Sequence, residues 1–155
     1  MTAALLRPAT INDADLLLKW VNDKSSLQWK QHTNNLIAPK HHINWLYSRL
    51  NDPTCQIWII SDAQEHALGQ VRLELEGKDV MVDIFVAPDN RGKGVASAAL
   101  SAAMKKFYET CGVDKFYAII HKNNEASLRL FESVGFSADQ HSKESWLTLR
   151  SSGKK

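Results

Sequence analysis

The sequence predicts one mixed α/β domain, in which an antiparallel meander precedes a strand–helix–strand crossover and helices cover both faces of a central mixed sheet. The chain has 155 residues, the usual size of a single domain with one core. Its apolar residues follow a helical period in the first third and the period of strands from residue 56 onward. A long amphipathic helix between two later strands implies a crossover, so part of the sheet should be parallel.

The first part of the chain should form a strand and two helices. A short strand is expected at residues 3–7, followed by a helix whose start Thr10 and Asp13 cap. Pro39 opens a second helical pattern, because proline is favoured in the first turn of a helix. The segment between these helices, residues 22–38, is expected to be irregular or weakly helical.

The next three segments have the period of strands and predict the antiparallel meander. An apolar run at residues 57–60 marks the first strand. In the second strand Val71 and Leu73 face one side, and the opposite side is polar, with Gln70, Arg72, Glu74 and Glu76. A hairpin turn around Gly77 leads to the third strand, which ends at Pro88.

The second half predicts two more helices and the remainder of the sheet. The longest amphipathic stretch covers residues 95–111 and ends at Gly112. A buried strand is expected at residues 115–120, and a further helix at residues 124–134. The segment that starts at Phe136 completes the sheet.

Composition limits the partners of this domain, which is expected at residues 1–150 with a disordered tail at 151–155. Nineteen basic and seventeen acidic residues leave a net charge of +2, too little for a surface that follows a nucleic acid backbone. The chain shows no signal-peptide pattern and no apolar window long enough to span a membrane. We therefore expect a cytoplasmic protein with a small-molecule partner, without nucleic acid or membrane, and leave a homodimer open.

Cysteine and histidine spacing predicts no metal site. Cys55 and Cys111 lie far apart and form no C-x-x-C pair, so reduced thiols are expected. The adjacent His41 and His42 point about 100° apart on a helix and have no third ligand at useful spacing.

A glycine-rich turn between a strand and a long helix carries the strongest chemical signal. Gly92 and Gly94 precede the helix, so its unpaired backbone N–H groups can point at an anion. The spacing of a P-loop is absent, and the dinucleotide fingerprint fails at Ser97, where it requires a third glycine. The run R-G-K-G-V-A, Arg91 to Ala96, resembles instead the Q/R-x-x-G-x-G/A signature of the GNAT family of N-acetyltransferases.

A second motif and the opening of the chain extend this resemblance to nearly the whole sequence. Residues 124–131, N-E-A-S-L-R-L-F, followed by Gly135 and Phe136, are similar to the family's N-x-x-[AS]-x-x-L-[YF]-x-x-x-G-F helix. The opening L-L-R-P-A-T with Trp20 is similar to the usual first strand and helix. The resemblance implies a GNAT-like sheet and acetyl-CoA as acetyl donor and cosubstrate.

The resemblance also implies which residues contact acetyl-CoA. The pantetheine arm of acetyl-CoA is expected along the strand before the glycine turn. The resemblance implies that main-chain N–H groups of this strand polarise the thioester carbonyl. The implied contacts are Ile84, Phe85, Val86, Arg91, Gly92, Lys93, Gly94, Val95, Ala96, Asn124 and Phe131. Phe131 departs from the family, because many members carry there a tyrosine that protonates the departing thiolate. Water, one of Tyr47, Tyr108 and Tyr117, or no group at all takes that role here.

Two carboxylates are candidates for the general base of an acetyl transfer. Asp83 interrupts an otherwise apolar strand end and is the first candidate, acting directly or through water; its alternative is a residue on the polar face of a strand. Glu74 on the adjacent strand is the second, although its polar neighbours favour a structural role. His121 could titrate near neutrality, but a capping or surface position is its simpler interpretation.

The first third of the chain carries the variable acceptor site in this family. Its candidate substrate-binding residues are Trp20, Asn22, Trp29, His32 and His42. The runs W-x-N-D and P-K-H-H-I-N-W-L resemble the acetyltransferases of pseudaminic-acid biosynthesis, which acetylate the 4-amino group of a UDP-linked amino sugar. Val21 replaces an arginine that is usual in those relatives. Trp20 and Trp45 also fit the spacing of core residues.

We therefore expect direct transfer of acetyl from acetyl-CoA to a primary amine, with a nucleotide-linked amino sugar for a surface or flagellar glycan as the first acceptor. A protein N-terminus or another small amine is the alternative acceptor. An acetyl-CoA-binding module without activity is the alternative from another class, because Phe131 lacks a phenol.

Overall fold

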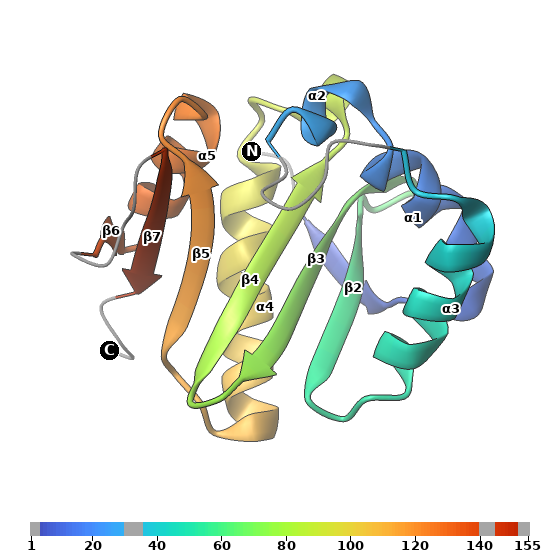
Figure 1. The fold of residues 1–155 in the computed structure, drawn as a ribbon, viewed down its shortest axis with the longest axis horizontal. Coiled ribbons are helices and arrows are strands. Elements are labelled where there is room, and N and C mark those ends of the chain that lie inside the picture. Colours follow the sequence, from blue (N-terminus) through green and yellow to red (C-terminus); the bar gives the residue numbers. More distant parts are fainter. Residues whose placement is uncertain (1–3, 30–35, 140–144, 152–155) are drawn as a thin grey trace.

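Seven strands form one sheet that runs through the molecule (Figure 1). The computed structural model describes residues 4–29, 36–139 and 145–151. The strands are β1 (Leu5–Pro8), β2 (Cys55–Ser61), β3 (Ala67–Glu76), β4 (Asp79–Val86), β5 (Phe116–His121), β6 (Phe136–Ala138) and β7 (Trp146–Ser151). Their order is β1-β2-β3-β4-β5-β7-β6, and every neighbouring pair is antiparallel except β4 and β5, which are parallel. The predicted fold class, with its meander and crossover, is confirmed.

The helices begin where the sequence places capping residues. The helical elements are η1 (Ile11–Asp13), α1 (Ala14–Val21), α2 (Lys24–Leu27), α3 (Pro39–Leu50), η2 (Pro88–Asn90), α4 (Val95–Cys111) and α5 (Glu125–Ser133). Thr10 and Asp13 form a reciprocal capping box ahead of α1. Asn124 caps α5, and Gly112 ends α4 in the left-handed conformation. These predicted boundaries are confirmed.

The two faces of the sheet are covered by different helices. Helix α4 crosses behind the central strands in Figure 1, and with α5 it buries the larger core. That core joins Leu100, Ala103, Phe107 and Phe131 to Val71, Leu73, Val80, Val82, Phe116, Ala118, Ile120 and Leu149. Helices α1 and α3 cover the opposite face through Leu17, Trp20 and Leu46, which pack on Cys55, Ile57 and Ile59.

Strands β4 and β5 pair only at their first residues and then diverge. The parallel register joins Val80 to Phe116 and Met81 to Tyr117, while β4 continues to Val86 and β5 to His121. Figure 1 shows the two strands separating toward their carboxyl ends. We call this divergence the splay. It opens next to the segment that leads from β4 into α4.

Two residues, Glu74 and Trp45, differ in burial from what the sequence predicts. Glu74 is only 9% exposed, because Arg49 and Trp45 of α3 reach over the β3 face that the sequence marks as polar. Trp20 is buried, whereas Trp45 on α3 is 40% exposed and is not a core residue.

Ser151 still belongs to β7, and its hydroxyl accepts a hydrogen bond from the Phe116 N–H at 3.2 Å, so the sheet extends one residue beyond the predicted boundary.

Candidate functional site

The glycine turn places an open helix N-terminus beside the end of β4. Gly92 and Gly94 both have a φ of 78°, in the left-handed region that favours glycine, and Gly94 is the N-cap of α4. No side chain caps this helix within the described residues. A Cβ at either glycine would meet nothing within 4 Å, so the turn is open on the side where these side chains would point. The backbone of Val95 and Ala96 can therefore face an anion.

Arg91 fixes the turn to the end of β4. Its Nε donates a hydrogen bond to the carbonyl oxygen of Val86 at 2.6 Å, and its guanidinium carbon lies 5.3 Å from the centroid of the Phe85 ring. The Phe85 ring in turn lies 5.7 Å from that of Trp20. Lys93 is exposed in the turn. Arg91 thus has a structural role in the turn in addition to its positive charge.

The edge of β4 along the splay presents backbone groups. The Val80 N–H donates to the carbonyl of Lys115, next to β5, at 2.8 Å. Because backbone groups alternate between the two edges of a strand, the N–H groups of Ile84 and Val86 face the same edge. Their contact with acetyl-CoA stays a prediction, and it is these backbone groups that would make it.

Phe85 faces the other edge with its backbone. A Cβ at Gly69 of β3 would lie 2.1 Å from the Phe85 carbonyl oxygen, so β3 and β4 approach too closely there for any other residue. The Phe85 side chain packs between Trp20 and Arg91. Phe85 therefore supports the site through its ring.

Asn124 and Phe131 lie on the other side of the splay. The Asn124 side-chain oxygen accepts the Ser127 N–H at 3.3 Å, which leaves its nitrogen as a donor for a ligand. Phe131 is 3% exposed and packs edge-on against Phe136, with ring centroids 5.0 Å apart. Phe131 is thus a core residue.

The tyrosines considered as acids are not placed like the family's phenol. The Tyr117 hydroxyl donates to Glu76 at 2.7 Å, and burial, aided by Glu76, raises the pKa of this phenol to about 12. Tyr117 also lies where β4 and β5 are still paired. Tyr47 is 65% exposed on α3, and Tyr108 lies in the last turn of α4, far from its N-terminus.

Asp83 lies on the face of the sheet that α1 and α3 cover. It is the cross-strand partner of Arg72, and its Oδ2 accepts a hydrogen bond from the Gln70 side chain at 3.1 Å. Its neighbour Phe85 packs on Trp20 of α1, which fixes the side to which both residues point. The carboxylate therefore lies beside the splay, opposite the α4 core.

Glu74, the second predicted base, is held by two guanidinium groups. One carboxylate oxygen accepts from Arg49 of α3 and the other from Arg72 of β3. This pairing explains how a carboxylate is tolerated at 9% exposure. Its catalytic role stays a prediction, while its structural role is plain from these contacts.

Among the residues that the structure describes, the predicted acceptor residues each contact a different part of the fold. Trp20 is buried on Phe85, and the Asn22 amide forms two hydrogen bonds with the backbone of Ile37, at 3.0 and 2.8 Å. His42 is 5% exposed, and burial lowers the pKa of its imidazole. Their substrate contacts stay a prediction, because each side chain already serves the fold. His32 lies outside the described residues.

Trp29 belongs to an aromatic cluster that the sequence did not reveal. Its ring lies 5.5 Å from that of His121, which lies 5.0 Å from the edge-on ring of Trp146. The Asn123 N–H donates to Nδ1 of His121 at 3.1 Å, so the neutral ring carries its proton on Nε2. This cluster joins the chain after α2 to the last residue of β5 and the first residue of β7. Only aromatic character marked these residues, which lie far apart in the sequence.

A second contact that the sequence did not reveal links α3 to the sheet face that α1 and α3 cover, which we call the acceptor face. The Arg72 guanidinium carbon lies 5.2 Å from the centroid of the Trp45 ring, and His42 packs beside the same ring at 5.8 Å. The alternation of β3 predicts the side on which Arg72 lies. No local signal indicates that Trp45 reaches it from another element.

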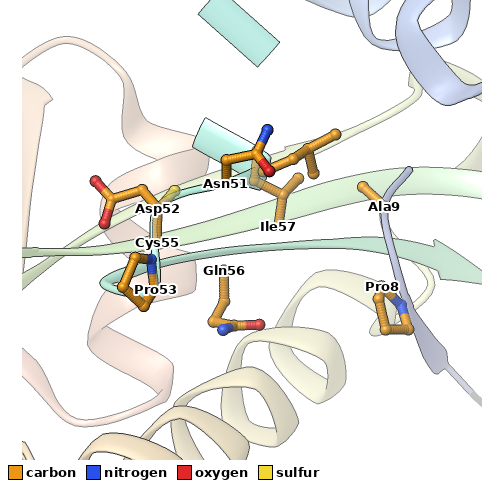
Figure 2. Close-up of a pocket in the computed structure, with 9 residues that line it drawn as sticks. Pro8, Ala9, Asn51, Asp52, Pro53, Cys55, Gln56 and Ile57 are labelled. Carbon is orange, nitrogen blue, oxygen red and sulfur yellow. The ribbon is translucent and has the colours of Figure 1, made fainter. Parts of the chain in front are cut away.

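A pocket of about 370 Å³ lies at the end of the sheet away from the glycine turn. Figure 2 shows the residues that line it. The pocket is lined by Pro8, Ala9, Leu50, Asn51, Asp52, Pro53, Cys55, Gln56 and Ile57. These residues come from the end of β1, the end of α3 and the start of β2, whereas the glycine turn follows the end of β4. Cys55 and Cys111 are unpaired, and burial, with the nearby Glu74, raises the pKa of the Cys55 thiol to about 11.

Two features are absent from the described part of the chain. No group of three or more histidine, cysteine or acidic side chains is arranged there to hold a metal ion. No helix there is both long and apolar enough to cross a bilayer.

The two motifs that resemble the acetyltransferase family lie at the glycine turn before α4 and at the start of α5, on the two sides of the splay. The chain belongs to that family: the family model described as "Acetyltransferase (GNAT) domain" matches residues 4–137. The family prediction is therefore confirmed.

Similar proteins include enzymes that act on polyamines. Spermidine N(1)-acetyltransferase of Escherichia coli K12 is 32% identical over 56 residues, which are 36% of this chain and 30% of that enzyme. A solved domain from Methanocaldococcus jannaschii has a TM-score of 0.84 at 22% identity, over 97% of this chain and 98% of its own. Spermidine N-acetyltransferase of Vibrio cholerae, solved with CoA and spermine, has a TM-score of 0.81 at 18% identity, over 95% and 92%. The match spans about 30% of the length of the curated relatives.

Proposed function

We propose that this protein transfers the acetyl group of acetyl-CoA directly to the primary amine of a small molecule. The observation that carries the proposal is the arrangement at the splay. Backbone donors of Ile84 and Val86 and the open α4 N-terminus lie along one edge, and the Asp83 carboxylate lies on the face opposite α4. One side of the splay thus suits an anionic donor and the other an amine.

The residues of the donor side fit acetyl-CoA, which supplies the acetyl group as a thioester when bound. The N–H groups of Val95 and Ala96, with the charges of Arg91 and Lys93, would hold its phosphates, because a helix N-terminus favours negative charge. The open space in front of Gly94 leaves room for a phosphate. Asn124 supplies an amide donor from the opposite side of the splay.

The chemical step requires a proton acceptor and a donor for the carbonyl oxygen. Asp83 takes the proton of the attacking amine, directly or through one water, while the C–N bond forms and the C–S bond breaks. Backbone N–H groups of β4 stabilise the negative charge that develops on the carbonyl oxygen. The thiolate leaves with the electron pair of the C–S bond. It needs no strong acid, because a thiol pKa is near ~8.5, so Phe131 does not preclude turnover.

Two acceptors deserve direct comparison. The sequence resemblance to pseudaminic-acid acetyltransferases supports a nucleotide-linked 4-amino sugar. That finer resemblance is not among the relatives reported above and stays a prediction. The Escherichia coli and Vibrio cholerae relatives, named for spermidine acetylation, support a polyamine instead.

The test is to follow release of free CoA thiol from acetyl-CoA with a chromogenic thiol reagent. The acceptors are a UDP-linked 4-amino sugar, spermidine and peptides with free N-termini. We expect turnover with at least one small amine and none above the hydrolysis background with peptides. Binding of acetyl-CoA without turnover on any amine would support the alternative of a module without activity. Absence of acetyl-CoA binding would contradict the proposed donor site.

A further inference from the structure

Arg72 lies directly beside the candidate base. Arg72 and Asp83 are cross-strand partners in the β3–β4 register, so both side chains are on the face that α1 and α3 cover. The Cβ atoms of such a pair are about 5 Å apart. A positive and a negative side chain therefore stand next to each other where the acceptor is proposed to bind.

The Arg72 guanidinium retains unused donors. It donates from Nη1 to Glu74, and its side chain is 19% exposed. Within the described ranges its Nε and Nη2 donate no hydrogen bond. An arginine presents five N–H donors in a planar fork, so those on the open side can still bind an oxyanion in a bidentate manner.

The charges around Arg72 are unevenly placed, although those of Arg49, Arg72, Glu74 and Asp83 together sum to zero. Glu74 is the only carboxylate that Arg49 and Arg72 contact among the described residues, so these three side chains sum to +1. The Arg49 Nε is buried without an acceptor in the described part of the chain. Burial lowers the pKa of His42, which adds no charge at neutral pH. The acceptor face thus has a net positive end at Arg72 and a negative one at Asp83.

Trp45 adds a flat surface at the positive end. Its ring lies 5.2 Å from the Arg72 guanidinium carbon and is 40% exposed. A tryptophan exposed to this extent on an inward-facing part of α3 leaves apolar area for a ligand to cover.

We propose that the acceptor carries an oxyanion, a phosphate or a carboxylate, close to its amine, and that Arg72 binds this group while Asp83 receives the amine. Trp45 contacts a planar or apolar part of the same molecule. This inference rests on the proposed function and adds the charge of the acceptor to it. A polyamine carries only positive charges and would place an ammonium group against Arg72, which the charge of this cluster opposes.

The test compares four amines with wild-type protein and with Arg72 variants. The amines are a UDP-linked 4-amino sugar, the same sugar without UDP, an α-amino acid and spermidine, which separate phosphate, neutral, carboxylate and polycationic acceptors. We expect wild-type kcat/KM to be highest for one of the two oxyanion-bearing amines and lowest for spermidine. Arg72→Gln should lower kcat/KM for that preferred amine by about tenfold to hundredfold, and by a much smaller factor for the sugar without UDP. Arg72→Lys should fall between, because it keeps the charge and loses the fork.

Arg49→Gln is the matched control, because it removes the other partner of Glu74 from the opposite side of the carboxylate. We expect it to change the kinetics of the oxyanion-bearing and neutral amines by the same factor. Titration calorimetry on the CoA-bound protein gives a readout independent of turnover. Arg72→Gln should weaken binding of the UDP-linked sugar or the amino acid by the same factor as kcat/KM, with the melting temperature as the check on folding.

A wild-type preference for spermidine, or an equal loss for charged and neutral amines in Arg72→Gln, would overturn the inference while leaving acetyl transfer to an amine intact. Absence of turnover on every amine would contradict the proposed function instead. In that case calorimetry still decides the inference, because oxyanion binding that does not depend on Arg72 would overturn it.

Discussion

The two faces of the sheet are built on different principles. On the α4 and α5 face the core is apolar, and the groups that suit a ligand are backbone N–H groups at the glycine turn and along β4. On the α1 and α3 face the groups are side chains, with Asp83, Arg72, Glu74 and Trp45 brought together from three elements. A backbone site needs only the correct turn, whereas a side-chain site needs every partner to be in place. One fold can therefore keep its donor site while its acceptor site changes.

The largest effect is expected where the acceptor face meets the chemistry. Asp83→Asn keeps the size of the side chain and removes the proton acceptor, so kcat/KM should fall by about 10²- to 10⁴-fold. Binding of acetyl-CoA should be unchanged, because its contacts lie on the other side of the splay. Steady-state kinetics and calorimetry measure the two quantities.

Asp79→Asn is the control for Asp83, since it removes a carboxylate from the same strand at the paired end of β4, where Asp79 contacts Arg150. Its effect on kcat/KM should be small. Glu74→Gln should mainly lower stability, because it leaves Arg49 and Arg72 without their anion. A loss of rate in Glu74→Gln equal to that in Asp83→Asn would reverse the order of the two candidate bases.

The faces should also differ in what holds them together. Phe107 is fully buried under α4, so Phe107→Ala should lower the free energy of unfolding by about 3–5 kcal/mol. Trp45→Ala on the other face should cost about 1 kcal/mol or less, because its ring is 40% exposed. Denaturant unfolding of both variants measures the difference. Similar losses would show that the acceptor face is as much a core as the α4 face.

Substitutions of the two glycines at the ends of α4 distinguish the effect of backbone strain from the effect on ligand binding. Gly94 and Gly112 have φ values of 78° and 74°, and a Cβ at either meets nothing within 4 Å. Alanine at each position should cost a similar ~1–2 kcal/mol of stability. Gly94→Ala alone should also weaken acetyl-CoA binding, by about fivefold to tenfold, because its Cβ stands where the phosphates approach. Equal acetyl-CoA affinity in both variants, measured by calorimetry, would place the phosphates elsewhere.

The smallest effect concerns the start of α1, where the contribution of Asp13 to stability depends on pH. The hydrogen bonds from Arg7, at 2.8 and 2.9 Å, and from the Thr10 N–H lower the pKa of Asp13 below its usual value. A lowered pKa in the folded state contributes stability above the unfolded pKa of ~3.9, and this contribution disappears as pH falls through the folded value.

Asp13→Asn should therefore cost about 1 kcal/mol at neutral pH, and progressively less as the pH falls below ~4 toward the lowered pKa of the folded state, where the wild-type carboxylate becomes protonated. Denaturant unfolding at pH 7 and at acid pH measures this change. A difference between the two proteins that does not depend on pH would show that shape at the cap, not charge, is what stabilises the helix start.

The elements were predictable because each depends on neighbours in the chain. The capping box at Thr10, the start of α3 at Pro39 and the αL residue at Gly112 are all confirmed, since each satisfies backbone groups within a few residues. The insertion of β7 between β5 and β6 was not specified, because strand order depends on long-range pairing. Asn124 was predicted correctly as a cap for the same local reason.

The candidate site divides along the same line. The glycine turn was found from its sequence, since only glycine adopts the required φ at low cost. The role of Asn22 was not, because no local pattern relates it to the Ile37 backbone that it contacts. The burial of His42 was not found either, although the Trp45 ring beside it lies three positions further along the same helix. Burial of Glu74 was missed because alternation in β3 gives the side on which a residue lies and not what covers that side.

By itself, the sequence determined the succession of the main strands and helices along the chain, the starts of α1 and α3, the end of α4, the crossover and the glycine turn before α4. These follow from hydrophobic period, capping and the conformational limits of glycine and proline. Tertiary structure alone decided that Arg72 stands between Glu74, Trp45 and Asp83, and that Trp29, His121 and Trp146 stack at the end of the splay. Those contacts join residues from separate elements, and their distances are set by how α3 and the chain after α2 pack on the sheet.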